Sequence, residues 1–295
     1  MAAGLGRDFT VMKALKKDGH FKGFSIAVIA VWMCVFTLIP FASMLTISFL
    51  TPGAHQFFHW QFTLNNYWLA IQLAYLTVFL RSIFWAATTT ALCLLIGFPF
   101  AYCVAKAPKR LRLFLLLLII IPFWTSSLIR TYAVMTVIKT NGLLNQFLLA
   151  WHLIKTPLHL LYTPLAVQIG LIYALLPFMI LPLFANLEKF NWTLTEAAKD
   201  LGAGKWKTFW TIVVPLSIPG IISGCLLVFL PAMTLFYLPN ILGGARSFLL
   251  GNLIKFEFLT GHNWPLGAAI SVFLCLFVAV LILAYGLKKQ RGKNT

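Results

Sequence analysis

At 196–215 the chain reads EAAKDLGAGKWKTFWTIVVP, the longest polar segment between its hydrophobic runs. Apolar residues here recur at i, i+3, i+4 and i+7, which predicts a short helix with one apolar stripe: Leu194, Ala197, Ala198 and Leu201. Thr193 and Glu196 predict a capping box at its start, and Gly202 predicts a left-handed residue at its end. Because so short a helix is marginal alone in water, we expect it to lie in a groove.

A second helix, rich in aromatic residues, is predicted over 205–214, and Pro215 is expected to end it because proline has no N–H. The two helices are predicted to form a small protruding contact element at the membrane surface. The alternative is a solvated loop helix that contacts no partner. The Gly-Lys pair at 204–205 is similar to the end of a phosphate-binding loop. However, Lys199 replaces the first glycine and Trp206 replaces the Ser/Thr, which disfavours nucleotide binding.

The composition is that of a membrane protein, with 61% hydrophobic and 10% charged residues in 295. The net charge of +17 does not indicate nucleic acid, because the basic residues are confined to short segments between apolar runs. The five cysteines lie in or beside apolar runs without C-x-x-C spacing, which is typical of small apolar core residues. His55 and His59 are four residues apart beside a Pro-Gly break and do not make a convincing metal site.

Hydrophobic runs predict an all-α membrane protein with six transmembrane helices, at about 23–50, 82–105, 113–129, 163–187, 216–238 and 265–287. The third run continues over 130–138, and 139–162 predicts a helix lying in the membrane interface. Pro177 and Pro182 are expected to kink the fourth span, and Gly220 and Gly224 predict a face for close helix contact on the fifth. Residues 240–264 are expected to form an outer loop.

We expect three parts along the chain: a basic tail at 1–22, a membrane domain at 23–287 and a second tail at 288–295. Of the 23 Lys and Arg residues, 17 lie in the two tails and in the loops 106–112 and 188–207. This asymmetry predicts that both termini and the 188–215 loop face the cytoplasm.

The polar segment resembles the cytoplasmic signature of ABC importer permeases, through these residues: Glu196-Ala197-Ala198, Gly202, Ile212 and Pro215, with Val214 in place of a leucine. In that family the segment is a coupling helix that docks into a cleft of the ATP-hydrolysing subunit. The resemblance therefore implies the type I ABC importer permease fold. It also implies an ATPase-coupling role for Glu196, Ala197, Ala198, Leu201 and Gly202.

Segments at 122–130, 175–183 and 263–269 are similar to the polyamine (spermidine/putrescine) permeases within this family. The similarity covers roughly 25–287 and implies a bacterial inner-membrane transporter subunit rather than an enzyme. Implied partners are a second related permease, two cytoplasmic ATPase subunits that bind ATP and Mg, and an extracytoplasmic polyamine-binding protein. It implies no cofactor and no metal in this chain.

Three alternatives remain beside this interpretation. One is a permease of the same fold for another solute. The others are a channel or secondary transporter acting alone, disfavoured because no buried ionisable pair is evident, and a membrane enzyme, disfavoured because no polar catalytic cluster is evident.

None of the six acidic residues lies inside a predicted span, so a polyamine would pass aromatic faces, hydroxyls and carbonyls. The predicted path residues are Trp124, Ser126, Ser127, Tyr132 and Tyr237, for each of which simple packing is the alternative. Arg130 is expected to anchor a helix or contact a partner. Glu257 is expected to attract polyamine or to contact the binding protein, and the alternative is a solvated charge beside Lys255.

Overall fold

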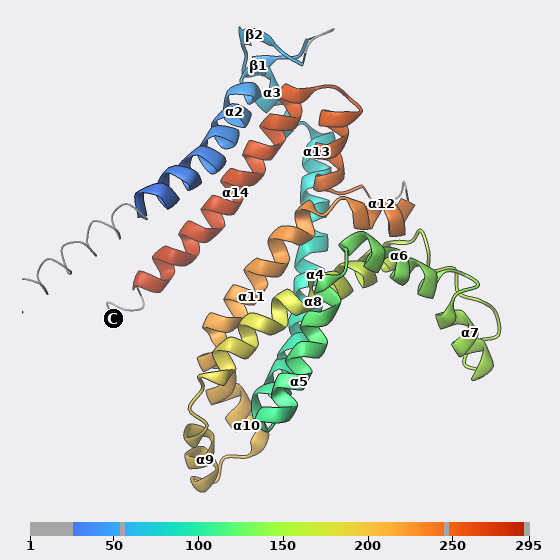
Figure 1. Cartoon of the computed structure of the whole chain (residues 1–295), viewed down its shortest axis with the longest axis vertical. Coiled ribbons are helices and arrows are strands. Elements are labelled where there is room, and N and C mark those ends of the chain that lie inside the picture. The colour runs from blue at the N-terminus through green and yellow to red at the C-terminus, as the bar shows by residue number, and fades with distance from the viewer. Residues whose placement is uncertain (1–25, 54–56, 245–247, 292–295) are drawn as a thin grey trace, which may run out of the picture. The chain divides into compact units, whose positions relative to one another are not determined.

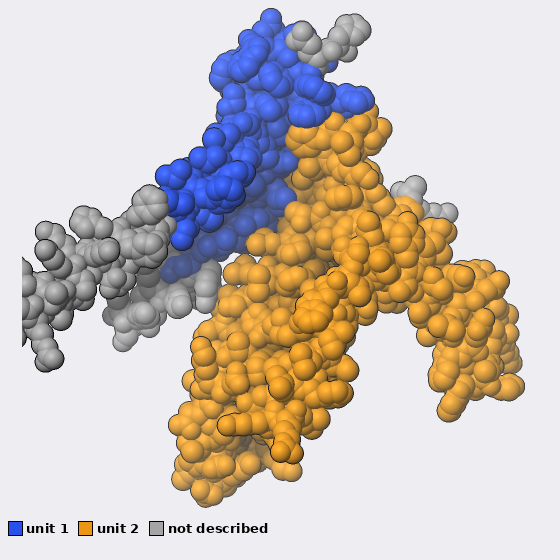
Figure 2. Space-filling model, viewed as in Figure 1, with its two compact units in different colours: residues 1–70, 262–295 blue, residues 71–261 orange. Residues whose placement is uncertain are grey.

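The computed structural model describes residues 26–53, 57–244 and 248–291, and most of this length is helical (Figure 1). The chain divides into two compact units, residues 1–70 with 262–295 and residues 71–261 (Figure 2). The basic tail at 1–22, the last four residues and His55 lie outside the described residues.

In chain order, the elements of the first unit are a helix over 26–48 that contains η1 (Cys34–Leu38) and α2 (Ile39–Ser48), then β1 (Leu50–Thr51), β2 (His59–Phe62), α3 (Asn65–Ile71) and, at its C-terminal end, α14 (Trp264–Arg291). Those of the second unit are α4 (Leu73–Lys106), α5 (Lys109–Ile120), η2 (Ile121–Trp124), α6 (Ser127–Ile138), α7 (Leu143–Ala150), α8 (Pro164–Glu188), α9 (Thr193–Asp200), α10 (Lys205–Thr208), η3 (Phe209–Val213), α11 (Val214–Thr234), α12 (Tyr237–Gly243) and α13 (Leu250–Leu259).

In the described part of the chain, five helices are long and apolar enough to cross a membrane, or six if one bent pair counts as a crossing. The five helices cover 26–48, 73–106, 164–188, 205–234 and 264–284. The bent pair covers 109–124 and 127–150. The predicted first, fourth and sixth spans are therefore found close to their expected bounds.

The first unit packs α14 against α2, and the two-stranded antiparallel β1–β2 hairpin follows α2 (Figure 1). Asn66 Nδ2 donates to the carbonyls of Ser48 (2.9 Å) and Leu50 (2.8 Å). These bonds satisfy the backbone where the first span ends, as buried carbonyls require.

The core of the second unit is the contact of α4, α8 and α11 around the fully buried Met179. A Cβ at Gly97 of α4 would lie 3.1 Å from Met179 Cγ, and one at Gly224 of α11 would lie 2.7 Å from Met179 Sδ. At Gly220 a Cβ would lie 2.7 Å from Asn186 Cβ. The predicted close-contact face of Gly220 and Gly224 is thus confirmed, and its partner is α8.

The third span was predicted over 113–129 with a continuation over 130–138, and the structure differs from this, because the chain bends by 100° between 109–124 and 127–150. Thr125 and Ser126 have extended backbones, with ψ of 151° and 136°. The Thr125 N–H and hydroxyl both donate to the Pro122 carbonyl, at 3.3 and 2.7 Å, which ends the 3₁₀ turn of η2. The Thr125 hydroxyl thus bonds back to the turn at the point where the helix ends, inside an otherwise apolar run.

The second and fifth spans also differ from expectation. Helix α4 begins at Leu73 rather than near 82. Pro215 does not end a helix: α10, η3 and α11 run on as one helix over 205–234, with Pro215 in the first turn of α11. The wide π-helical turn of η3, which ends two residues before Pro215, accommodates the proline ring and its missing N–H.

The expected outer loop at 240–264 is largely helical, since it contains most of α12 and all of α13. Ser82 Oγ of α4 accepts the Leu250 N–H at 2.7 Å, and Asn252 Nδ2 donates to the Phe236 carbonyl at 3.0 Å. These long-range bonds fix two helices that are too short to be recognised from hydropathy.

Candidate functional site

Helix α9 begins differently from the prediction. Asn191 Oδ1 accepts hydrogen bonds from the Thr193 N–H (3.1 Å) and the Thr193 hydroxyl (2.7 Å). Thr193 is therefore the first helical residue and does not cap the helix, so the predicted capping box with Glu196 was wrong. An Asn two residues upstream makes this turn readily, and it takes the hydroxyl that the capping box would have used.

The end of α9 is as predicted. Gly202 has a φ of +82°, its N–H donates to the Lys199 carbonyl (2.8 Å), and the Ala203 N–H donates to the Ala198 carbonyl (2.9 Å). This pair of bonds is the Schellman motif, which closes the last orphan carbonyls of a helix and needs a left-handed residue.

The apolar stripe of α9 faces away from the rest of the chain. Leu194 is 45% exposed and Leu201 is 89% exposed, and Glu196 and Ala197 are also exposed. On the inner side of the helix, Thr195 is buried. A short helix whose apolar side chains lack packing within their own chain has the form of a docking element.

An aromatic cluster attaches this segment to the end of α4. The ring of Phe209 lies 5.6 Å from that of Phe98 and 5.8 Å from that of Tyr102, both edge to face. Tyr102 also lies 5.7 Å from Trp192, which precedes α9. The Lys106 ammonium lies 4.3 Å from the centre of the Tyr102 ring and 5.0 Å from that of Trp192. Such contacts link the residue before α9 to the end of α4 and to η3, which continues into α11.

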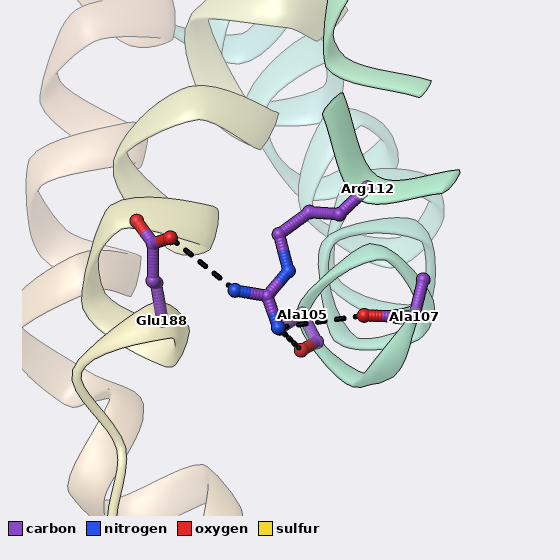
Figure 3. A network of polar contacts seen from close by, with 4 residues as sticks. All are labelled: Ala105, Ala107, Arg112 and Glu188. Atoms are coloured by element: carbon purple, nitrogen blue, oxygen red, sulfur yellow. Dashed lines mark hydrogen bonds and ion pairs between the residues drawn. The ribbon is translucent and has the colours of Figure 1, made fainter. Parts of the chain in front are cut away.

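Arg112 joins three helix ends beside this segment (Figure 3). Its Nη1 lies 3.3 Å from Glu188 Oε1, at the last residue of α8, and its Nη2 donates to the carbonyls of Ala105 (2.9 Å) and Ala107 (3.4 Å). Glu188 is half exposed, so the ion pair itself contributes little. The two backbone bonds matter more, because they close the tight turn between α4 and α5.

The predicted path residues fall around the bend between η2 and α6. Trp124 is 83% exposed and Tyr132 is 56% exposed, while Ser126 is exposed and Ser127 is half-buried. Tyr237 is half-buried at the start of α12, which packs on α6. The structure thus places four of the five on or beside one broken helix and the fifth on its neighbour.

Arg130 lies across the same bend, with its guanidinium carbon 4.7 Å from the centre of the Phe123 ring. This contact ties α6 back to η2 and agrees with a helix-anchoring role.

Glu257 is not a solvated charge, because only 6% of the residue is exposed. Its Oε1 accepts the Tyr75 hydroxyl at 3.4 Å, and burial raises the pKa of Glu257 while this hydrogen bond opposes the shift. Sequence reasoning missed this site because its two residues are 182 positions apart.

Within the residues that the structure describes, no group of three or more His, Cys, Asp or Glu side chains could hold a metal ion.

These features define the class: a multi-pass helical membrane protein that presents a short exposed helix between two of its spans. Residues 93–291 match the family model described as "Binding-protein-dependent transport system inner membrane component". The chain belongs to this family, and it is a transport permease subunit rather than an enzyme.

Three similar relatives carry the name "Spermidine/putrescine transport system permease protein PotB". The protein from Salmonella typhimurium is 45% identical over 92% of this chain and 94% of its own length. That from Escherichia coli is 46% identical over 88% and 94%, and that from Haemophilus influenzae is 44% identical over 91% and 94%.

Among solved structures, a bacterial ABC transporter that imports the acidic polysaccharide alginate matches with a TM-score of 0.71 at 19% identity. The match covers 96% of this chain and 99% of that chain. At this identity the likeness shows the fold alone.

Proposed function

We propose that this chain is one permease of an ATP-driven importer of spermidine, putrescine or both. It would pair with a second related permease, take polyamine from an extracytoplasmic binding protein, and be driven by two cytoplasmic ATPase subunits that bind ATP and Mg. The relatives named for spermidine and putrescine transport support the solute, since they match over about nine tenths of the chain.

The observation that carries the mechanism is the outward-facing stripe of α9. Leu201 is 89% exposed, although it ends a helix that cannot be stable alone. We propose that Glu196, Ala197, Ala198, Leu201 and Gly202 dock into a cleft of the ATPase. Movement of the ATPase would then pass through the aromatic cluster around Phe209 to α4 and α11.

For the solute we propose a path around the bend at Thr125 and Ser126. The exposed ring of Trp124 and the backbone left extended at the bend offer a cation a π-face and carbonyl oxygens. Such groups bind a desolvated ammonium weakly, by about 2 kcal/mol for a cation–π contact. Binding this weak would let a polyamine enter the path and also leave it.

The function is tested by reconstituting the chain with its permease partner and ATPase in lipid vesicles. Binding protein loaded with spermidine, then with putrescine, should stimulate both ATP hydrolysis and uptake of the loaded amine. If only an unrelated solute stimulates hydrolysis, the fold assignment stands and the polyamine assignment is wrong.

The docking step is tested with Leu201→Asp. Burying a leucine is worth about 1.5–3 kcal/mol, so we expect ATPase affinity for the membrane subunits to fall by roughly 10- to 150-fold. Lys207→Gln, which changes an exposed residue of the same segment away from the stripe, should leave that affinity unchanged. Equal affinities for the two variants would refute docking through the stripe.

A further inference from the structure

A groove of about 900 Å³ opens between α4, α9 and the helix formed by α10, η3 and α11. We name it the α4–α11 groove. Its lining residues are Ala91, Leu94, Leu95, Phe98, Pro99, Tyr102, Cys103, Lys106, Thr195, Lys199, Lys205, Trp206, Thr208, Phe209, Trp210, Val213, Val214 and Ile221.

Along most of its length the groove is apolar. Its α4 wall runs from Ala91 to Lys106, about 22 Å at the rise of an α-helix. That length exceeds half of a membrane core of about 30 Å, so a groove that begins at the membrane surface would extend through about one leaflet. Leu95 on this wall is 70% exposed, which leaves the groove open on its side.

At one end, the groove is strongly basic. Lys106, Lys199 and Lys205 line it, and no Asp or Glu is among its lining residues. Lys106 donates to the Tyr102 hydroxyl, whereas Lys199 and Lys205 are exposed and form no ion pair within the described ranges 26–53, 57–244 and 248–291. Trp206 and Trp210 beside them are 75% and 57% exposed, as aromatic residues at a membrane interface are.

We propose that the α4–α11 groove binds one anionic phospholipid from the leaflet on the α9 side. The acyl chains would lie along the α4 wall, and the phosphate would sit between Lys199 and Lys205. The apolar part of the groove matches the acyl chains of such a lipid, and the lysines at its end match the anionic headgroup.

Two other occupants fit less well. The N-terminal tail of this chain carries five basic residues between positions 7 and 22, and the three lysines would repel it. A transmembrane helix of a second permease would cover the apolar wall but leave the ammonium groups without counter-charges.

The test is native mass spectrometry of the purified full chain in detergent, titrated with phosphatidylglycerol and separately with phosphatidylcholine. Each lysine near a phosphate contributes about fivefold to affinity, so Lys199→Gln with Lys205→Gln should weaken phosphatidylglycerol binding by about 30-fold. Phosphatidylcholine binding should not change. Ala91→Trp, which places a large ring in the apolar part of the groove, should weaken both lipids.

The matched control is Lys109→Gln with Arg110→Gln, which removes two exposed cations in the first turn of α5 that do not line the groove. It should keep wild-type affinity for phosphatidylglycerol. The proposal would be overturned if both double variants lost equal affinity for phosphatidylglycerol, or if the wild type bound the two lipids equally well. Either result would mean that lipid binding is nonspecific. Displacement of the lipid by inorganic phosphate, without any effect of Ala91→Trp, would make the site a simple anion site and also overturn it.

Discussion

Gly202 is the residue on which the shape of the exposed segment depends. Its φ of +82° is a backbone conformation that side chains disfavour, although a Cβ there would meet no atom within 4 Å. We expect Gly202→Val to cost about 1–2 kcal/mol at this turn. The variant should insert normally but lose solute-stimulated ATP hydrolysis and uptake in reconstituted vesicles, because α9 would be tilted.

Gly204→Ala is the matched control, since Gly204 has a φ of −63° and equally open surroundings. It should behave as the wild type in both assays. Normal uptake by Gly202→Val would show that the turn is not needed for coupling.

We expect Glu257 to make stability depend on pH. Because burial raises its pKa in the folded chain, the folded state keeps a proton that the unfolded state has released. Stability should therefore fall as the pH rises above the ordinary glutamate value of 4.5 and on through the raised pKa. We expect Glu257→Gln to flatten this dependence and to raise the thermal midpoint at neutral pH, measured in detergent at several pH values.

Glu196→Gln, which changes an exposed carboxyl, is the variant for comparison in the same measurement. A lower midpoint of Glu257→Gln at neutral pH would mean that the carboxylate is ionised and paired with a cation, contrary to this expectation.

At the scale of elements, the contact of α11 with α8 depends on the absence of a side chain at Gly224. A Cβ there would lie 2.7 Å from Met179 Sδ and 3.2 Å from the Met179 carbonyl oxygen. We expect Gly224→Ala to destabilise the unit by about 1–3 kcal/mol through overpacking. Combined with Met179→Ala, it should cost less than the sum of the two single changes, as a double-mutant cycle of unfolding free energies in detergent would show.

Gly286→Ala is the control for helix propensity, because a Cβ at Gly286 meets nothing within 4 Å. Additive costs for Gly224→Ala and Met179→Ala would mean that the helices relax independently of this contact.

The elements that could be predicted from sequence are those fixed by local signals. Thr163 Oγ1 accepts the Ala166 N–H at the start of α8, and the apolar run after it ends where α8 ends. Likewise, glycine is the residue that most readily adopts the positive φ seen at Gly202. The elements that were mispredicted depend on competition or on distant partners. Asn191 displaces the capping box, the Thr125 hydroxyl bonds back to the turn where a helix ends within an apolar run, and α13 is fixed by Ser82 on α4.

The same distinction applies to the site. The apolar stripe and the end of α9 could be predicted from the local sequence. The burial of Glu257 against Tyr75 could be seen only in the folded structure. For the path residues, the residue types suggested a polar patch. The 100° bend at which Trp124, Ser126 and Ser127 lie was seen only in the structure.

At the scale of the whole molecule, the number of crossings and the charge asymmetry constrain each other. If both basic tails face the cytoplasm, the chain crosses the membrane an even number of times. The five unbroken helices alone would place the tails on opposite sides, so the bent pair at 109–124 and 127–150 must count as the sixth crossing. A re-entrant pair would instead put α9 on the outer face, away from any ATPase.

Fusion proteins distinguish these two topologies. With six crossings, a fluorescent protein fused after the last residue should fluoresce, and alkaline phosphatase fused after Lys155 should be active, because phosphatase folds only outside the cytoplasm. Phosphatase fused after Lys189, directly beyond α8, should be inactive and serves as the matched control. Activity at Lys189 with none at Lys155 would mean that the bent pair returns to its own side. In that case α9 could not reach a cytoplasmic ATPase. The predicted orientation and the proposed coupling through α9 would then both be wrong.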